Sequence, residues 1–540
     1  MPSIDELKNK YFVQSGDANP PSEPVPATYE GCLVTPLIDG EAYFDELATA
    51  FAAVGTGATP SDNAGHYIYI AGWWLHLLGG QVNPAPGSTG SVGPTLGMGS
   101  PFALDGPDGA NRLIDLLKAK AKAGVDVRVL GWVSWATMTS AMAQNYAVSI
   151  RDVNVGTISA IHSLRQEPEL ADKCCLNILS HTAGAVHAKM VIVGIDATAM
   201  GFTGGIDFVA NRHSDDLHTS GSWHDVQVKV EGAAVQALYD FFKQMWDEVI
   251  ARPVGTFRVG SDDVPSVVSG TTQVPAKTVP AASVGTHHVQ SLRTVPQFKY
   301  VWYNMLPEGD PISFAPDGLF EVNLAWRKAI LAAEQYIYME DQAFWSVEVM
   351  SWINQAIKNH PDLKVILVTG VPDPSDPTLP PFNVVALESG LLPGLTTTDI
   401  DRIRVYGRDV VVHSKTTLVD DHWAIIGSAN CMRRSLYTDV EHSMAVIDEL
   451  DQLVKEYRVN LWGGHFDLPP GGRSILNDLS QALNVWNSAW GAPGSGVTLP
   501  SHFGQVTLPP PTVTISDKDQ EKYDRYLDPD SRQDWGGCLP

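Results

Sequence analysis

The 540-residue chain has few basic residues and no long apolar run. It carries 36 Lys and Arg residues against 61 Asp and Glu residues, which gives a formal net charge of −25 at pH 7. Because nucleic-acid binding depends on Lys and Arg side chains that replace counterions on phosphates, this balance argues against a nucleic-acid partner. The most apolar run, residues 67–78, is shorter than the roughly 20 residues that a membrane-spanning helix needs. We therefore expect a soluble chain.

Cysteine is also scarce. The chain has five cysteines, an odd number, and their spacing fits no zinc or disulfide framework. Carboxylates, histidines and cysteines do not cluster at metal-ligand spacing either, so we expect no metal and no other cofactor. Residues 1–12 lack the apolar stretch of a signal peptide. The compartment stays open: cytoplasmic as the sequence stands, secreted if a leader has been removed.

The chain repeats itself once. Residues 66–75, HYIYIAGWWL, resemble residues 335–345, QYIYMEDQAFW, and each stretch follows a segment with the apolar spacing of a helix. The other repeated pairs, in chain order, are residues 123–132 and 361–370, 185–193 and 411–419, 203–208 and 426–431, and 224–246 and 438–462. Alternating strand and helix signals predict an α/β fold of two similar halves, each with a mixed or mostly parallel sheet flanked by helices. The halves should pack with pseudo-twofold symmetry around one active site.

The length allows more than one hydrophobic core, and the repeat indicates where the chain divides. We predict an N-terminal half at 1–255 and a C-terminal half at 285–540. Between them, residues 256–284 are rich in Val, Thr, Ser and Pro and are typical of a linker.

Each copy of the repeat carries a histidine and a lysine two residues apart, His187 with Lys189 and His413 with Lys415. Residues i and i+2 of a strand point to the same face, so each pair projects together. Two histidines in opposite protonation states can supply a nucleophile and an acid, while two lysines hold negative oxygens. These groups fit displacement at a phosphodiester through a covalent phosphohistidine, without a metal.

The second copy matches the full HxKxxxxDxxxxxxGSxN signature of the phospholipase D superfamily. The residues that carry the match are His413, Lys415, Asp420, Gly427, Ser428 and Asn430. Over most of its length, including residues 223–232 and 289–296, the chain also resembles phosphatidylcholine-type phospholipases D.

The resemblance implies a division of labour between the histidines. His187 would be the nucleophile, and His413 would be the general acid and later the base that activates water. Asp225 and Asp439 match the acidic residues that orient each imidazole in this family. A carboxylate on the far ring nitrogen fixes the tautomer and stabilises the imidazolium, which is a sound physical reason for these two residues.

The resemblance also implies a phosphate-binding set. Lys189, Lys415 and Asn430 would bind phosphate oxygens, with Ser428 nearby. Asp420 belongs to the signature, and we expect it to be largely structural, tying down the turn after its strand.

The first copy departs from the signature. Gly194 stands where the signature has aspartate, and the nearest acid is Asp196. The segment 189–204 is longer than usual, which we interpret as an extended turn between two strands. Asp207 takes the place of Asn430, and it could either accept a bond from a lysine or substrate hydroxyl, or repel a phosphate.

The leading functional hypothesis is a phospholipase D. Such an enzyme hydrolyses the distal phosphodiester bond of glycerophospholipids such as phosphatidylcholine to phosphatidic acid and an alcohol, and a second alcohol can capture the intermediate. The partner would be phospholipid, reached by transient contact of a monomer with a membrane or micelle. Two alternatives stay open: another enzyme of the superfamily, such as a nuclease or a phosphatidylserine or cardiolipin synthase, and a catalytically silent lipid-headgroup-binding protein.

Overall fold

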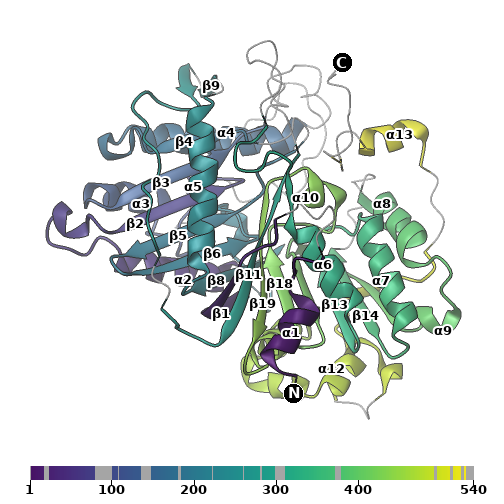
Figure 1. Ribbon diagram of the computed structural model, residues 1–540. Helices are drawn as coiled ribbons and strands as arrows, with labels where there is room; N and C mark the ends of the chain where they lie inside the picture. The colour runs from purple at the N-terminus through teal and green to yellow at the C-terminus, as the bar shows by residue number, and fades with distance from the viewer. Residues whose placement is uncertain are drawn as a thin grey trace.

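A single mixed sheet runs through the protein. The computed structural model describes residues 2–17, 24–79, 100–107, 109–134, 147–179, 184–219, 221, 223–253, 255–259, 261–279, 282–297, 311–370, 379–491, 496–510, 515–524, 528 and 530. Within these residues, 16 strands form one sheet, which helices cover (Figure 1).

The two halves of this sheet have the same strand order. From edge to centre, the strands of the first half are β4 (Cys174–Asn177), β3 (Asp126–Trp132), β2 (Tyr67–Gly72), β5 (Met190–Ile195), β6 (Thr198–Gly204), β8 (Val226–Glu231) and β1 (Thr28–Ile38). Those of the second half are β15 (Ile403–Arg408), β14 (Lys364–Gly370), β13 (Tyr336–Glu340), β17 (Thr416–Val419), β18 (Trp423–Gly427), β19 (Glu441–Asp448) and β11 (His287–Val295). Two short strands are extra, β20 (Phe503–Gln505) beside β15 and β12 (Leu319–Phe320) beside β11.

The halves meet at the β1–β11 pair, which is antiparallel. In each half the three outer strands are parallel and the rest are antiparallel. An antiparallel pair between equivalent strands is what a twofold axis through the centre of a sheet requires. The predicted α/β class with two similar halves is confirmed.

Helices cover both halves of the sheet (Figure 1). They are α1 (Ile4–Tyr11), α2 (Asp39–Ala53), α3 (Leu113–Lys122), α4 (Ala147–Arg165), α5 (Val235–Ala251), α6 (Glu321–Leu331), α7 (Val347–Asn359), α8 (Leu379–Ala386), α9 (Thr397–Ile400), α10 (Arg433–Tyr437), α11 (Leu453–His465), α12 (Leu479–Trp486) and α13 (Asp517–Lys522). Every residue of β2 and β13 is buried, as expected for parallel strands packed on both faces. Among these helices none is both long and apolar enough to cross a membrane.

The first helix packs on the opposite half from the one that its place in the chain suggests. Leu7 and Tyr11 belong to the hydrophobic cluster built mainly from α6, α7 and β13. Figure 1 shows α1, in purple, beside the green helix α6. The predicted division at 256–284 stays a prediction. The helix α1 lies in the predicted N-terminal half of the sequence but packs on the C-terminal half.

The predicted linker packs on the first half as a strap. Its start forms a hairpin of β9 (Thr256–Val259) and β10 (Asp262–Pro265). Further along, the Tyr239 hydroxyl donates to the carbonyl of Pro275 at 2.7 Å, and Val274 and Val279 are buried. Apolar residues of the segment therefore extend the core beneath α5.

The first copy of the repeat lengthens its strands rather than its turn. The strands β5 and β6 have six and seven residues, whereas β17 and β18 have four and five. The expectation of an extended turn was wrong, because the additional residues continue the ladder to the pair of Ile195 and Thr198. At Gly194 a side chain is excluded, since an added Cβ would lie 2.0 Å from the Tyr67 ring.

Asp420 anchors the second copy of the repeat through side-chain hydrogen bonds. Gly194, at the equivalent place in the first copy, has no side chain that could form them. Its carboxylate accepts the backbone N–H groups of Glu334, Gln335 and Tyr336 at 2.7–2.9 Å, and the Tyr11 hydroxyl at 3.0 Å. These donors lie at the start of β13 and on α1. In the folded protein, Asp420 is thus a turn anchor, as its place in the sequence suggests.

Replacing Asp420 should destabilise the protein, and Asp196 offers a matched control. Both residues have positive φ, 57° and 49°, so alanine brings the same backbone strain to each. The Asp196 side chain, however, is exposed. We expect Asp420→Ala to lower the free energy of unfolding by about 2–4 kcal/mol more than Asp196→Ala, because three buried N–H groups lose their acceptor. Equal urea midpoints for the two variants would contradict this role.

Candidate active site

The fold brings the two His-x-Lys pairs together at the seam between the halves. The ring centroids of His187 and His413 lie 6.5 Å apart, with the ring planes at 69°. Both imidazoles and both lysines, Lys189 and Lys415, are buried. The structure thus places all four residues in one site, as the repeat predicts.

Backbone bonds across the seam hold each histidine segment. The N–H groups of His187 and its neighbour donate to the carbonyl of Val440 at 2.8 and 2.9 Å. In the same way, the N–H groups of His413 and its neighbour donate to the carbonyl of His224 at 2.7 and 3.1 Å. Each histidine therefore rests on a strand end of the other half.

The carboxylates that orient the imidazoles also come from the opposite halves. Nδ1 of His413 lies 2.7 Å from Asp225 Oδ2, and Nδ1 of His187 lies 3.0 and 3.1 Å from the two oxygens of Glu441. With Nδ1 occupied in both rings, Nε2 is the nitrogen left for chemistry.

The expected role of Asp439 therefore needs correction. Asp439 does not contact the His187 ring; it forms an ion pair with Arg434 at 2.7 Å and accepts the backbone N–H of Ala185 at 2.7 Å. Glu441, two residues further along, takes the place beside the imidazole. Asp439 acts on the site through the backbone that leads to His187 and through its charge, which opposes the lowering of the His187 pKa.

The strand register explains the error. The glycine that ends β6 faces Gln227, and the glycine that ends β18 faces Ser443. Two residues before these partners stand Asp225 and Glu441, which are therefore structural equivalents. The similar sequences HDVQ and TDVE suggest an alignment two residues out of register. A shift of two keeps every side chain on the same face, so the alternation of side chains cannot reveal it.

The two lysines lie beside the histidines. Lys189 Nζ donates to the carbonyl of His187 at 2.8 Å, lies 3.7 Å from Asp207 Oδ2, and is 5.3 Å from the centroid of the Trp73 ring. Lys415 Nζ donates to the carbonyl of His413. Burial lowers the pKa of Lys415 to about 8. Burial disfavours the charged form of the two lysines. A bound phosphate anion would offset this effect, because its negative charge would pair with the buried ammonium groups.

Of the remaining predicted residues, Asn430 fits a role in binding and Ser428 does not. Asn430 is buried, and its Oδ1 has no hydrogen-bond partner among the residues described. Ser428 was expected near phosphate, but its hydroxyl donates to Glu441 at 2.5 Å, as that of Ser435 does at 2.7 Å. The buried carboxylate requires these donors, so Ser428 positions Glu441.

Asp207 faces the site from the first copy of the repeat. Its Oδ1 accepts the backbone N–H of Trp74 at 3.1 Å, and the nearby Lys189 is its cationic neighbour. Of the two alternatives left open by the sequence, the geometry matches the contact with a lysine.

Each histidine and its carboxylate form a dyad that titrates near neutral pH. Burial, followed by the charges of the site lysines, lowers the pKa of His187 well below its ordinary value. Burial and the nearby cations act on His413 in the same direction. Burial also raises the pKa of Asp225 and of Glu441 to about 7. Because the groups of a dyad share a proton, each dyad as a unit takes up one proton near pH 7.

A buried polar network supports the His413 dyad from behind. The backbones of Asp39 and Asp225 are linked, and Asp225 N–H also donates to Asp39 Oδ1 at 2.9 Å. The ring of His224 bridges Asp39 and Glu340, at 3.2 and 3.0 Å. Burial opposes a charge on His224, but these two carboxylates raise its pKa to about 10.

The same network has the residue types of a metal site, since Asp39, His218 and His224, and His224, Glu340 and His465, offer converging atoms. These atoms are already engaged with one another. Both ring nitrogens of His224 face carboxylates, and the Arg408 guanidinium lies 2.9 Å from His465. The cluster fits a network that holds Asp225 in place better than it fits a cation.

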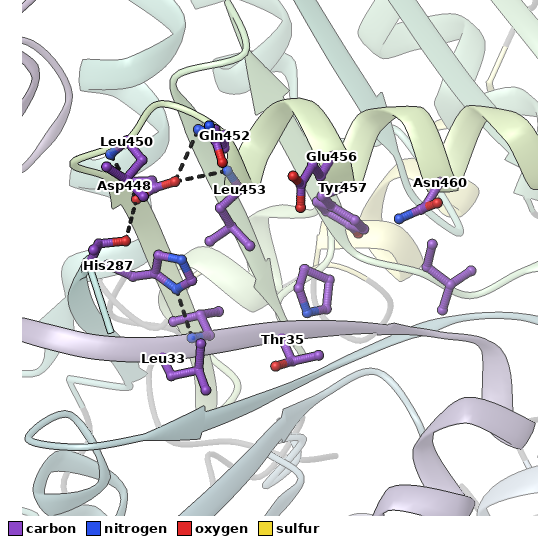
Figure 2. A pocket seen from close by; sticks show the side chains of 14 residues that line it. Leu33, Thr35, His287, Asp448, Leu450, Gln452, Leu453, Glu456, Tyr457 and Asn460 are labelled. Carbon is purple, nitrogen blue, oxygen red and sulfur yellow. Dashed lines mark hydrogen bonds between the residues drawn. The ribbon is translucent and has the colours of Figure 1, made fainter. Parts of the chain in front are cut away.

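A separate pocket lies between β1 and α11. It has a volume of about 380 Å³, and Figure 2 shows the side chains that line it. Its polar groups serve the fold: Asp448 accepts the first N–H groups of the α11 segment, and His287 Nδ1 accepts the N–H of Val34 at 2.8 Å. Neither His-x-Lys pair lines this pocket.

Sequence reasoning missed several residues of the site. Glu441 was hidden by the register shift, and Trp73, whose ring lies edge-on to His187 at 5.5 Å, was one of several tryptophans near strand ends. Arg212 packs on the Trp223 ring, which in turn meets the His413 ring. Both residues lie outside the two His-x-Lys motifs, so neither motif marks them.

The chain is similar to known proteins, most specifically around the second His-x-Lys pair. The family model described as "Cardiolipin synthase, PLD-like domain" matches residues 327–463, which include the second His-x-Lys pair. A cardiolipin synthase of Alkalihalophilus pseudofirmus is 24% identical over 358 residues, which cover 66% of this chain and 59% of that protein. Phospholipase D alpha 4 of Arabidopsis thaliana is 23% identical over 525 residues, with 78% and 64% covered.

Among solved structures, the phosphatidylserine synthase of Haemophilus influenzae is similar with a TM-score of 0.47 and 12% identity, covering 85% of this chain and 89% of that one. This chain spans less than two thirds of the length of the two curated relatives named above. Residues 327–463 thus match a PLD-like domain, and the chain is similar over most of its length to relatives described as cardiolipin synthase and phospholipase D.

The corrected dyad predicts different effects for two neighbouring carboxylates. Glu441→Gln should lower kcat by about 10²–10⁴-fold, because His187 loses the group that orients it, while the fold persists. Asp439→Asn should instead lower the free energy of unfolding by about 2 kcal/mol or more, since the buried ion pair with Arg434 is lost, and should keep most of kcat. Steady-state kinetics and thermal unfolding measure both effects. The reverse pattern would restore Asp439 as the orienting residue.

Proposed function

We propose that the protein is a phosphodiesterase and phosphatidyltransferase acting on glycerophospholipids through a phosphohistidine on His187. The observation that supports this most directly is the pair of imidazoles 6.5 Å apart, each with its Nδ1 on a buried carboxylate and each beside a lysine. Two dyads of this kind can hold one proton between them, which gives one nucleophile and one acid.

The first step transfers the phosphatidyl group to the protein. Nε2 of His187 forms a bond to phosphorus as the bond between phosphorus and the headgroup oxygen breaks. Nε2–H of His413 gives its proton to that oxygen, and the headgroup leaves as a neutral alcohol. Lys189 and Lys415 bind the non-bridging oxygens, where negative charge is concentrated.

The second step reverses the roles. His413, now neutral, takes a proton from water as the water oxygen bonds to phosphorus and the phosphorus–nitrogen bond breaks. The products are phosphatidic acid and free His187. An alcohol in place of water gives a new phosphodiester, so hydrolysis and headgroup exchange share one intermediate.

Binding of the substrate helps to place the proton. Without an anion, burial and the site cations lower the pKa of both histidines. A phosphodiester carries one negative charge, so its binding offsets the field of the lysines and raises the pKa of the acid dyad. We infer that substrate binding stabilises the protonated His413 that the first step needs.

Hydrolysis of phosphatidylcholine and transfer to a lipid alcohol are both compatible with this chemistry. Transfer is favoured as a second candidate by the relatives, since the matched family model and one curated relative are described as cardiolipin synthase. The two activities differ only in which hydroxyl reaches the phosphohistidine. The acceptor therefore decides between them.

Competition between water and ethanol tests the shared intermediate. With phosphatidylcholine or phosphatidylserine in neutral-detergent micelles and a chelator present, we expect phosphatidic acid and phosphatidylethanol together, in a ratio that follows the ethanol concentration. His187→Ala should abolish both products, whereas His162→Ala, at a partly exposed histidine of α4 that faces Asp262, should keep them. Turnover by His187→Ala, or hydrolysis without any phosphatidylethanol, would rule out the proposed intermediate.

The dyads also predict the pH dependence of kcat/KM. The nucleophile dyad has to lose its proton, so the rate rises with pH up to about 7, and the acid dyad has to keep its proton, so the rate falls above about 7. In Asp225→Asn the carboxyl with the raised pKa is absent, so His413 keeps a proton only at lower pH. The basic limb should move down by at least about one pH unit, while the acidic limb stays in place. An unchanged basic limb would contradict the assignment of His413 as the acid.

A further inference from the structure

Arg212 is a buried cation without an anionic partner. Its residue is 3% exposed, its Nη1 donates to the neighbouring Asn211 side chain at 3.0 Å, and its Nε has no acceptor. In the part of the chain that the structure describes, no carboxylate comes within 4.0 Å of the guanidinium. Arg402 and Arg458 are also buried, and they do meet a carboxylate, Asp399 and Asp421, each at 2.6 Å. Arg408 lies against two imidazoles instead, those of His218 and His465, each at 2.9 Å.

An unpaired buried guanidinium is unfavourable unless something else supplies the anion. Burial lowers the pKa of Arg212, and the carboxylates of Asp207 and Asp225 oppose this only from beyond ion-pair distance. The open donors of the guanidinium therefore fit an incoming carboxylate or phosphate, for which the planar fork of arginine is well shaped.

Arg212 stands on the side of the proton donor. Its Cζ lies 3.4 Å from the centroid of the Trp223 ring, and the same ring meets His413 edge-to-face at 5.5 Å. Trp223 also pairs with Val411, two residues before His413. Because His413 protonates the leaving oxygen, groups packed around it border the headgroup rather than the diacylglycerol.

We propose that Arg212 and Trp223 form a headgroup subsite that selects phospholipids whose headgroup carries a second anionic group, a carboxylate or a phosphate. This inference rests on the proposed function, and it narrows the substrate class. A quaternary ammonium such as choline binds best on open aromatic faces. At Trp223 one face is already covered by a guanidinium, whose charge repels the choline cation.

The overall charge of the protein opposes anionic lipids, so their recognition depends on local cations such as Arg212. With a net charge of −25, the protein is repelled from anionic lipid surfaces. A test of headgroup preference must therefore exclude the interface, so the substrates should be dihexanoyl phospholipids below their micelle concentration. Phosphatidylserine supplies a carboxylate and phosphatidylglycerol phosphate supplies a second phosphate. Phosphatidylglycerol has neither group, and phosphatidylcholine carries the quaternary ammonium.

The measured quantity is the ratio of kcat/KM for each headgroup with a second anionic group, phosphatidylserine with its additional ammonium included, to kcat/KM for phosphatidylglycerol. We expect at least one of these ratios to exceed ten in the wild type, to fall to about one in Arg212→Gln, and to be intermediate in Arg212→Lys. The exposed Arg258 provides the control, and Arg258→Gln should keep the wild-type ratio. A wild-type ratio near one, or a ratio that Arg212→Gln leaves unchanged, overturns the subsite.

Binding separates this proposal from the proposed function. In the His187→Ala background, calorimetry with the same lipids should show at least tenfold tighter binding of a headgroup with a second anionic group than of phosphatidylglycerol, and Arg212→Gln should remove the difference. If the wild type turns over none of the lipids but this difference is present, the phosphohistidine proposal fails and the subsite stands. If turnover occurs but neither binding nor the kcat/KM ratio depends on Arg212, the subsite fails alone.

Discussion

Each imidazole of the candidate site is held by a carboxylate from the other half of the chain. Asp225, from the first half, meets His413, and Glu441, from the second half, meets His187. Neither half could therefore assemble a working dyad by itself. The antiparallel β1–β11 pair, which fixes how the halves meet, is the structural constraint on which the chemistry depends.

Burial gives these contacts their chemical meaning. In water an aspartate and a histidine titrate far apart. In this seam burial raises the pKa of the Asp225 carboxyl and lowers that of the His413 imidazole, so the two groups can share one proton. The network behind the site adds a buried imidazolium at His224, balanced by Asp39 and Glu340. That network holds Asp225 in the same position whether His413 is protonated or neutral. Within this strongly acidic protein, the site thus holds three buried cations, Lys189, Lys415 and Arg212, among buried carboxylates.

Much of the architecture could be predicted because the same order of strand, helix and motif signals occurs twice in the sequence. Two weak His-x-Lys motifs became a strong signal once they occupied equivalent strands, and the same strand order in both halves follows from the repeat. The predictions that failed concern features that the two-residue alternation of side chains along a strand cannot reveal. Asp439 and Glu441 share a strand face, so only the register of β19 against β18 could separate them. The packing of α1 on α6 and the strap formed by the predicted linker depend on tertiary contacts with no local sequence signal.

A covalent adduct on His187 is the most direct test of the account. In His413→Ala, which lacks the general acid, a phosphatidyl ester of p-nitrophenol has a leaving group that needs no protonation, and the absent base should leave the intermediate intact. We expect a burst of one equivalent of p-nitrophenolate per protein and, after rapid quenching and proteolysis, a phosphatidyl group on the peptide that contains His187. A burst without an adduct on that peptide, or an adduct at another residue, would contradict the account.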